Sequence, residues 1–275
     1  MSPICHIGPI TFGAGRLALI AGPCQAESLK LCLQVAGKVS EICRELGIGY
    51  VFKASYDKAN RSSLRSRRGP GLTQGLAWLA EVRRRYRVPI LSDVHETSQV
   101  ARAGRVLDAL QIPALLCRQT DLLLAAGRSG KPVNIKKGQF MAPADMAEAV
   151  AKVRSTGNRN VLLTERGTFF GYNRLVNDFR SIPQMRPLAP VVFDATHSVQ
   201  EPGALGKSSG GQRIYAPILA AAAMAAGADA LFIETHPDPA KALSDAACQI
   251  PLDELRGVLE KCLGVFLEMH RSPGP

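Results

Sequence analysis

The sequence predicts an α/β protein built as a (β/α)8 TIM barrel, a closed ring of eight parallel strands surrounded by helices. Three observations support this fold class. Eight short apolar segments follow one another along the 275-residue chain, and helix-like segments lie between most of them. Polar and charged residues come directly after the apolar segments, at the strand ends where a barrel of this kind carries its active site.

The eight strand candidates are continuous in apolar residues, as parallel strands are when both faces of their sheet are covered. They are residues 17–22, 50–55, 89–93, 109–112, 133–136, 161–165, 191–194 and 230–234. A doubly wound sheet is the alternative architecture, but it commonly places a glycine-rich phosphate turn after its first strand. Residues 21–25 follow the first candidate here, and they contain no GxGxxG pattern.

The helix candidates are amphipathic segments between the strands. Apolar residues at positions 31, 35, 39, 42 and 46 recur with a period near 3.6, which predicts a helix over residues 28–46. The other clear helices are predicted over residues 75–86, 143–154, 216–226 and 252–267, whereas the segments after the third and sixth strands show a weaker pattern.

Two segments outside the predicted barrel strands and helices have distinctive sequences, one at the N-terminus and one after the seventh strand. Residues 1–275 are predicted to form a single barrel domain, in which residues 1–16 are an N-terminal extension. Within the extension, residues 4–7 and 10–12 flank Gly8 and Pro9 and predict a small hairpin at the barrel base. Residues 203–211 are rich in Gly and Ser and predict a long substrate loop after the seventh strand.

Composition narrows the function classes. Hydrophobic residues make up 46% of the chain, which excludes a disordered protein. The net charge of +11 leaves two alternatives, a nucleic-acid-binding face or cations that surround small anionic substrates. Seven cysteines without a CxxC pair indicate a reducing compartment rather than a disulfide framework.

We expect no contact with membranes and a cytoplasmic location. The first ten residues lack a basic region followed by an apolar one, which a secretory signal would have. The longest apolar run, residues 216–226, is interrupted by Pro217 and is too short to span a bilayer.

Cationic residues at three strand ends point to an anionic substrate. Lys53, Lys136 and Arg166 would repel one another inside a barrel mouth unless a phosphate or carboxylate neutralised them. The loop after the second strand adds arginines and serines, including Arg61 and Ser62, that suit a phosphate cradle. An RNA-binding loop is the alternative, but no aromatic residues lie between these arginines to stack on bases.

A second group of residues has the character of a metal site. Cys24, His197, Glu234 and Asp245 follow different strands and would supply one sulfur, one imidazole and two carboxylates. Such a mixed set fits borderline divalent ions such as Fe²⁺, Zn²⁺ or Mn²⁺. The residues alone leave two explanations open, a metal site and a set of ordinary structural residues. A single Cys is also common as a small buried residue, and a single His is also common as a hydrogen-bonded one.

The chain resembles the 3-deoxy-D-manno-octulosonate 8-phosphate synthases from about residue 17 to about residue 255. The matching motifs include Ala21-Gly22-Pro23-Cys24 and Phe193-Asp194-Ala195-Thr196-His197. Further matches are residues 51–55, 57–63, 92–96, 111–114, 118–121, 134–140, 164–167, 198–200, 209–211, 232–237 and 242–246. The resemblance implies a (β/α)8 barrel, a homotetramer, and a transferase that supplies an eight-carbon sugar acid for lipopolysaccharide.

The implied substrates are phosphoenolpyruvate and D-arabinose 5-phosphate. The related 3-deoxy-D-arabino-heptulosonate 7-phosphate synthases use erythrose 4-phosphate and carry Pro-Arg-Thr near Ala59-Asn60-Arg61-Ser62 of this chain. Asn60 therefore favours the five-carbon sugar phosphate, and the heptulosonate synthase is the alternative. A basic nucleic-acid-binding protein is the lesser alternative.

The resemblance also implies roles for individual residues. One branch of the family carries Asn at position 24, whereas the branch with Cys binds a divalent ion (Zn, Fe, Mn or Co) through residues matching Cys24, His197, Glu234 and Asp245. The implied catalytic residues are Lys58, His197, Asp245 and Cys24. The implied substrate-binding residues are Lys53, Ser55, Asn60, Arg61, Ser62, Asp93, Gln111, Ala114, Arg118, Lys136 and Arg166.

Overall fold

The computed structural model of the chain describes residues 3–60, 67–169, 174–202 and 210–271. Within these residues, eight parallel strands form a closed barrel, which confirms the predicted fold class. The barrel strands are β3 (Ala18–Gly22), β4 (Gly49–Lys53), β5 (Ile90–Asp93), β6 (Ala109–Ile112), β7 (Val133–Lys136), β8 (Val161–Glu165), β11 (Val191–Asp194) and β14 (Ala230–His236). Neighbours in this order are paired, and β14 pairs with both β11 and β3, which closes the ring.

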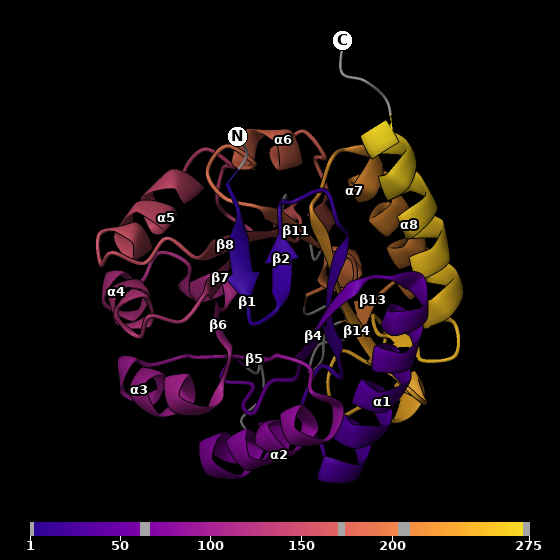
Figure 1. Cartoon of the computed structure of the whole chain (residues 1–275), viewed down its shortest axis with the longest axis horizontal. Coiled ribbons are helices and arrows are strands. Elements are labelled where there is room, and N and C mark those ends of the chain that lie inside the picture. The colour runs from indigo at the N-terminus through magenta and orange to yellow at the C-terminus, as the bar shows by residue number, and fades with distance from the viewer. Residues whose placement is uncertain (1–2, 61–66, 170–173, 203–209, 272–275) are drawn as a thin grey trace.

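Helices surround the barrel, as the view along it shows (Figure 1). They are α1 (Leu29–Leu46), α2 (Gly71–Tyr86), α3 (Thr97–Val106), α4 (Thr120–Arg128), α5 (Met146–Arg154), α6 (Ser181–Met185), α7 (Ala216–Ala225) and α8 (Leu255–Arg271). The longest one, α1, is capped at both ends. Its Ser28 hydroxyl accepts a hydrogen bond from the Leu31 amide, and Gly47 adopts the left-handed conformation that ends the helix.

The barrel interior is apolar near the amino ends of the strands and polar near their carboxyl ends. Side chains that point inward from the first halves of the strands, such as Ile20, Val51 and Leu162, form one buried cluster. Toward the carboxyl ends, the inward positions are polar and include Lys53 and Gln111, both nearly inaccessible to solvent. Gly22 permits β3 and β4 to approach closely here, because a Cβ atom on it would lie 2.0 Å from the Lys53 carbonyl oxygen.

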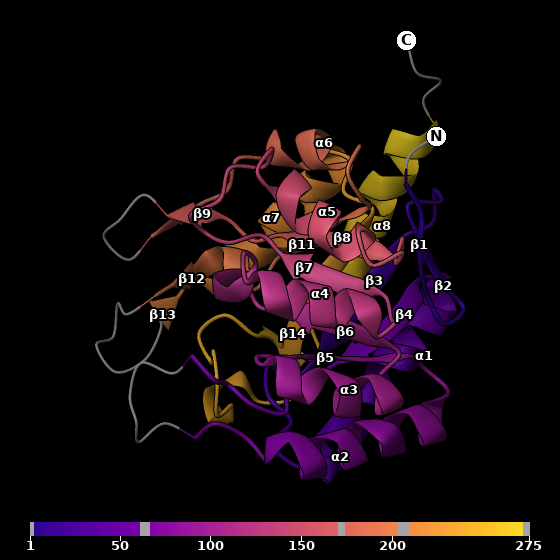
Figure 2. The same cartoon turned by 90° about the vertical axis from the view of Figure 1, so that its left-hand side faces the viewer.

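The predicted N-terminal hairpin is present. Strands β1 (Cys5–Ile7) and β2 (Ile10–Phe12) pair antiparallel, and the turn between them begins with Gly8 at a positive φ of 55°. Cys5, Ile7 and Phe12 are fully buried in the same cluster as the apolar part of the barrel interior. The hairpin therefore closes the base of the barrel, and Figure 2 shows it at the end opposite to β9 and β12.

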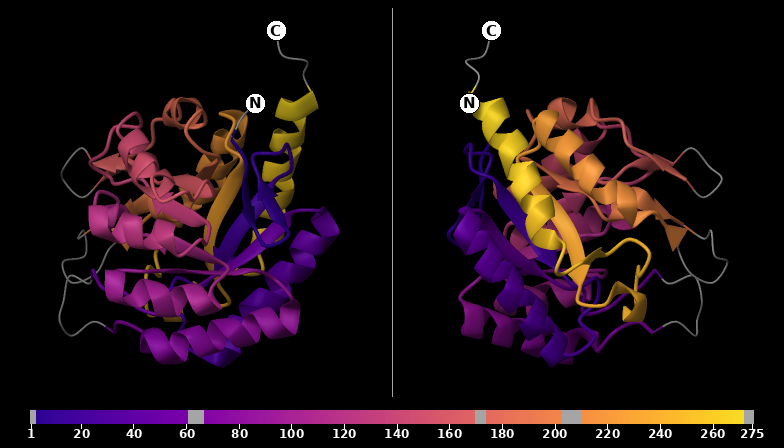
Figure 3. Two further views of the ribbon diagram at one scale, coloured as in Figure 1. Left: turned by 60° about the vertical axis from the view of Figure 1, so that its left-hand side comes forward. Right: turned by 90° about the vertical axis from the view of Figure 1, so that its right-hand side faces the viewer.

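Short additional strands and helical turns lie at the end of the barrel that holds the carboxyl ends of the strands (Figure 3). Strand β9 (Thr168–Phe169) pairs with β10 (Leu175–Val176), and β12 (Gln200–Glu201) pairs with β13 (Gly210–Gly211). Strand β15 (Ile250–Pro251) pairs in parallel with the carboxyl end of β14. Single helical turns are η1 (Ala114–Leu116), η2 (His197–Val199), η3 (Arg213–Tyr215) and η4 (Pro239–Lys241). Most of the predicted loop at residues 203–211 lies outside the described residues; its last two residues form β13.

Among the described residues, no helix is long and apolar enough to cross a membrane.

Candidate active site

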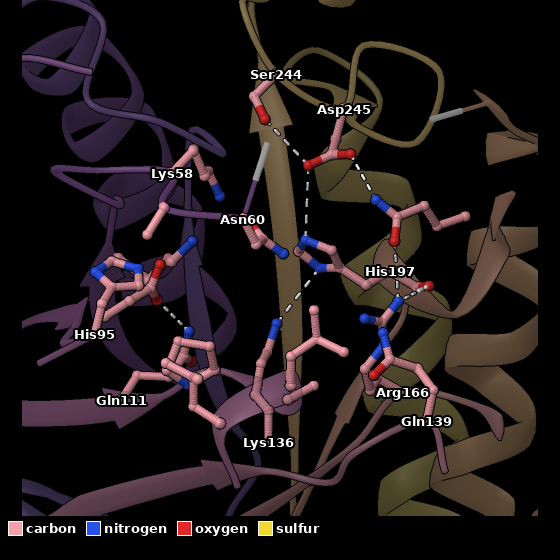
Figure 4. A pocket seen from close by; sticks show the side chains of 18 of the residues that line it. Lys58, Asn60, His95, Gln111, Lys136, Gln139, Arg166, His197, Ser244 and Asp245 are labelled. Atoms are coloured by element: carbon pink, nitrogen blue, oxygen red, sulfur yellow. Dashed lines mark hydrogen bonds and ion pairs between the residues drawn. The ribbon is translucent and has the colours of Figure 1, made fainter. Parts of the chain in front are cut away.

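A cavity of about 690 Å³ opens at the carboxyl ends of the barrel strands. Its size is typical of a pocket for small ligands. The polar residues around it come from many different strand ends and loops, and Figure 4 shows several of them pointing toward one another. They are Lys53, Lys58, Asn60, Arg67, Asp93, His95, Glu96, Gln111, Lys136, Gln139, Arg166, His197, Gln200, Ser244 and Asp245.

A group of four potential metal ligands lies beside the cavity, and two of them, His197 and Asp245, line it. Cys24 follows β3, His197 begins η2, Glu234 lies in β14 and Asp245 lies in the loop before β15. One ligand atom from each of the four lies within 4.8 Å of all the others. His197 Nε2 is 3.5 Å from Glu234 Oε2 and 3.9 Å from Asp245 Oδ2. The barrel thus joins residues that are up to 221 positions apart in sequence.

A buried carboxylate oxygen of this group lacks a hydrogen-bond partner, which suits a cation. Burial raises the pKa of the Cys24 thiol, and Glu234 raises it further, so the thiol keeps its proton and donates to Asp245 Oδ2 at 3.1 Å. Glu234 Oε2 is buried and has no hydrogen-bond partner, an arrangement that is costly for a carboxylate. A divalent ion would replace the thiol proton and satisfy this oxygen.

Asp194 orients the imidazole of His197. Its Oδ2 lies 2.8 Å from His197 Nδ1, and its Oδ1 accepts a hydrogen bond from the His197 amide at 2.9 Å. When Nδ1 donates to this carboxylate, the lone pair of Nε2 faces Glu234 and Asp245. A carboxylate behind a histidine is the usual way in which proteins fix the tautomer of a metal ligand.

Asp245 is held in a strained conformation. Its φ of 47° is rare for a residue other than glycine. Two side chains secure it, because Gln200 Nε2 donates to its Oδ1 at 2.7 Å and Ser244 Oγ to its Oδ2 at 3.1 Å. Strain that is maintained by specific contacts in a cavity indicates a functional residue.

The part of the cavity next to His197 is cationic. Lys136 is nearly buried, its Nζ lies 2.5 Å from Asp194 Oδ2, and burial lowers its pKa despite that carboxylate. Arg166 Nη2 donates to the His197 carbonyl and to Gln200 Oε1, both at 3.0 Å, while its buried Nε has no partner. These fixed positive charges can bind an anion without much rearrangement.

Lys53 and Lys58 bring positive charge close to Glu234. Lys53 Nζ is 2.9 Å from Glu234 Oε1, and Lys58 Nζ is 4.0 Å from the same oxygen. Burial works to lower the pKa of Lys53, but the carboxylates of Asp93 and Glu234 raise it above its ordinary value. Both lysines therefore remain protonated beside the metal-ligand group, since the pKa of Lys58 is raised in the same way by Cys24 and Glu234.

Comparison with known proteins places this geometry in a family. The model of the DAHP synthetase I family matches residues 4–272. The chain belongs to the DAHP synthetase I family. Similar proteins named 2-dehydro-3-deoxyphosphooctonate aldolase occur in Syntrophotalea carbinolica (59% identity; 96% of this chain and 96% of the relative) and Desulfotalea psychrophila (57%; 93% and 92%). A third, from Nitrobacter winogradskyi, is 53% identical over 95% of this chain and 92% of its own length.

Most residues singled out from the sequence meet around the cavity of this family member. Ten of them line it: Lys53, Lys58, Asn60, Asp93, Gln111, Ala114, Lys136, Arg166, His197 and Asp245. Cys24 and Glu234 complete the group of potential metal ligands. Ser55 lies behind the lining residues, where it is fully buried and donates a hydrogen bond to Asp93.

One described residue, Arg118, does not join them, and two others cannot be placed. Arg118 is exposed and is absent from the described residues that line the cavity. Its carbonyl oxygen accepts a hydrogen bond from Lys152 instead. Arg61 and Ser62 lie outside the described residues.

Four residues of this family member's site were not predicted as such. Asp194 bridges Lys136 and His197, Gln200 bridges Arg166 and Asp245, Gln139 lines the cavity, and Ser244 donates to Asp245. Asp194 could have been recognised by its place at the end of a predicted strand. Gln139 and Ser244 lie in loops and Gln200 lies in the two-residue strand β12, and the positions of these segments relative to the barrel strand ends cannot be read from the sequence.

Proposed function

We propose that this chain condenses phosphoenolpyruvate with D-arabinose 5-phosphate and water, and releases 3-deoxy-D-manno-octulosonate 8-phosphate and inorganic phosphate. It is a C–C bond-forming transferase of the lipopolysaccharide precursor route. The observation that carries this conclusion is 59% identity, over 96% of both chains, to a relative named 2-dehydro-3-deoxyphosphooctonate aldolase. The eight-carbon acid in that name is the product of the proposed reaction.

The eight-carbon product is favoured over the seven-carbon alternative. The family description refers to DAHP synthetase, but relatives at 53 to 59% identity carry the octonate name. Asn60, which lines the cavity, supports the same choice because it marks enzymes that use the five-carbon sugar phosphate.

Phosphoenolpyruvate takes the cationic part of the cavity. Its phosphate binds Lys136 and Arg166, which are nearly buried and already fixed by neighbouring side chains. Lys53 lies toward its carboxylate, with Gln111 and Ala114 along the wall. The family resemblance also implies that Arg118 binds phosphoenolpyruvate, and we propose this role for it. Fixed cations offset the substrate charge and align its reactive C3 carbon.

D-Arabinose 5-phosphate lies nearer the cavity mouth, along Asn60 and Lys58, with its phosphate on Arg61 and Ser62. C3 of phosphoenolpyruvate bonds to the aldehyde carbon, the aldehyde oxygen takes a proton, water adds at C2, and the C2–O bond to phosphate breaks. We assign Lys58 as the donor to the aldehyde oxygen, since it lines the cavity and stays protonated. His197 and Asp245 position the attacking water.

Cys24, His197, Glu234 and Asp245 hold a divalent ion, which is Zn, Fe, Mn or Co. The buried Glu234 oxygen without a hydrogen-bond partner and the mixed sulfur, nitrogen and oxygen donors support this assignment. When bound, the ion supplies a Lewis acid beside the cavity. Gln200 holds Asp245 in place by a hydrogen bond, and Asp194 does the same for His197.

We further propose that the enzyme is a cytoplasmic homotetramer that binds neither nucleic acid nor membranes. All seven cysteines are free and buried, which suits a compartment that keeps thiols reduced. Exposed large apolar side chains support association between copies, among them Phe140, Phe169, Ile214 and Ile218.

Initial rates of phosphate release from phosphoenolpyruvate test the proposed function. We expect turnover with arabinose 5-phosphate and a rate that is lower by roughly 100-fold or more with erythrose 4-phosphate, as expected when a sugar contact is lost. Mass spectrometry of the product should show the eight-carbon phosphorylated acid. Faster release with erythrose 4-phosphate would assign the chain to heptulosonate synthesis instead.

A further inference from the structure

A row of buried polar side chains crosses five neighbouring strand ends at the floor of the cavity. We call it the polar row; its members are Lys53, Ser55, Asp93, Gln111, Asn134 and Thr164, which are carried by β4 to β8 and the residues just after β4. Each member is hydrogen-bonded to the next. Barrel interiors are commonly filled by branched apolar residues, so an unbroken polar row in this layer requires an explanation.

The hydrogen bonds of the polar row have a fixed direction. Asp93 only accepts when ionised, and it receives bonds from the Ser55 hydroxyl on one side and from Gln111 Nε2 on the other. Gln111 Oε1 accepts from Asn134 Nδ2 at 3.0 Å. The Thr164 hydroxyl then donates to Asn134 Oδ1 at 2.7 Å, which fixes the amide of Asn134 in turn.

The direction of these hydrogen bonds determines which amide atom of Gln111 can contact a ligand in the cavity. Its amide nitrogen carries two hydrogens, and the bond to Asp93 uses one of them. Gln111 also lines the cavity, so the second N–H is available there, while the amide oxygen is occupied by Asn134. The opposite amide orientation would place the oxygen against Asp93 and remove the N–H donor.

We propose that Asn134 and Thr164 are positioning residues for phosphoenolpyruvate, which hold the Gln111 amide so that it presents an N–H donor to the anionic substrate. This inference rests on the proposed function. Both residues are fully buried and neither is among the described residues that line the cavity, so they act only through Gln111. Burying two polar side chains without such bonds would be unfavourable, and the row satisfies both.

Asn134→Leu is the main test, because leucine has a similar size and no donor for Gln111. We expect the KM for phosphoenolpyruvate to rise about tenfold, the effect of one weakened hydrogen bond to substrate, and the KM for arabinose 5-phosphate to stay within about twofold. In a Gln111→Met background, Asn134→Leu should cause no further rise, since the residue through which it acts is gone. Equal rises in both backgrounds would overturn the proposal.

Substitutions of Thr164 test the same proposal with a smaller change in side-chain structure. Thr164→Val removes the hydroxyl at constant shape and should raise the same KM by a smaller factor, whereas Thr164→Ser should restore it. Thr156→Val is the control, because the Thr156 hydroxyl bonds only to the Val153 carbonyl at the end of α5. Identical kinetics for Thr164→Val and wild type would contradict the proposal, even if Asn134→Leu failed to fold.

Calorimetry with phosphoenolpyruvate alone separates this inference from the proposed function. Weaker binding to Thr164→Val than to wild type would support the polar row even if arabinose 5-phosphate were not turned over. A wild-type protein that does not bind phosphoenolpyruvate would overturn the proposal.

Discussion

Cys24 is buried at the end of β3, and its thiol contacts Asp245 within a group of four potential metal ligands. Six other cysteines are buried as well, but they lie elsewhere in the described structure and do not belong to this group. Burial alone therefore does not distinguish Cys24. Its neighbours do, because two carboxylates and an imidazole surround its sulfur atom.

Cys24→Ala should abolish stable binding of the divalent ion, since it removes the only sulfur ligand from the set. We expect the metal content per chain, measured by elemental analysis after reconstitution with Zn²⁺, to fall at least about tenfold, the size of effect that smaller changes around metal sites produce. Cys32→Ala is the control, because Cys32 is buried in α1 and should leave the metal content unchanged. Equal metal content in both variants would exclude Cys24 as a ligand.

The four potential ligands illustrate how far the sequence can predict the site. They come from the ends of three predicted strands or the loops beyond them, so their spacing along the chain carries no metal signature; their residue types suggested a mixed metal site, and the family resemblance made that site the preferred interpretation. The structure then brings them together within 4.8 Å. Gln200 and Ser244 could not be predicted, because their contacts with Asp245 depend on how short segments outside the barrel strands pack against one another.

At the scale of elements, β7 and β8 are joined by a buried ion pair just outside the cavity. Lys137 Nζ lies 3.5 Å from Glu165 Oε1 and donates to the Thr168 hydroxyl at 3.1 Å. Glu165 Oε1 also accepts hydrogen bonds from the amides of Arg166 and Gly167. The pair thus shapes the turn that carries Arg166 into the cavity.

Lys137→Met should lower the free energy of unfolding by about 3 kcal/mol, because it leaves the Glu165 carboxylate buried without its cation. Urea denaturation measures the change. Lys38→Met is the matched control: Lys38 pairs with Glu41 on the surface of α1, where both side chains are about half exposed, and its loss should cost less than about 0.5 kcal/mol. Similar losses in the two variants would mean that the buried pair contributes little.

Elements differed in how well the sequence predicted them. All eight barrel strands were located, because each is a continuous apolar run that is buried on both faces. Helices α3, α4 and α6 were not defined. Helix α3 buries only Val100 and Ala103, α4 has nine residues, and α6 has five residues including a proline. Such short helices show few turns from which to establish a helical period, although α5 and α7 are of similar length and were predicted.

At the scale of the whole molecule, the barrel and its hairpin share one interior, and we infer that residues 1–275 form a single domain. Cys5, Ile7 and Phe12 of the hairpin pack in the same buried cluster as Ile20 and Phe232 of the barrel. The hairpin closes one end of the barrel, and the described residues that line the cavity lie at the other end, at the carboxyl ends of the strands.

Four of the positive charges of this basic chain gather at one place in this architecture. Lys53, Lys58, Lys136 and Arg166 converge on the cavity, where two anionic substrates would neutralise them. The carboxylates of Asp194 and Glu234 keep this group of cations in place until the substrates arrive.

The most direct test of the account measures phosphate release from phosphoenolpyruvate and arabinose 5-phosphate before and after dialysis against a strong chelator. The four-ligand site beside the cationic cavity predicts that activity is lost with the metal and returns when Mn²⁺ or Zn²⁺ is added. Full activity in protein shown by elemental analysis to be free of metal would contradict the role of Cys24, His197, Glu234 and Asp245.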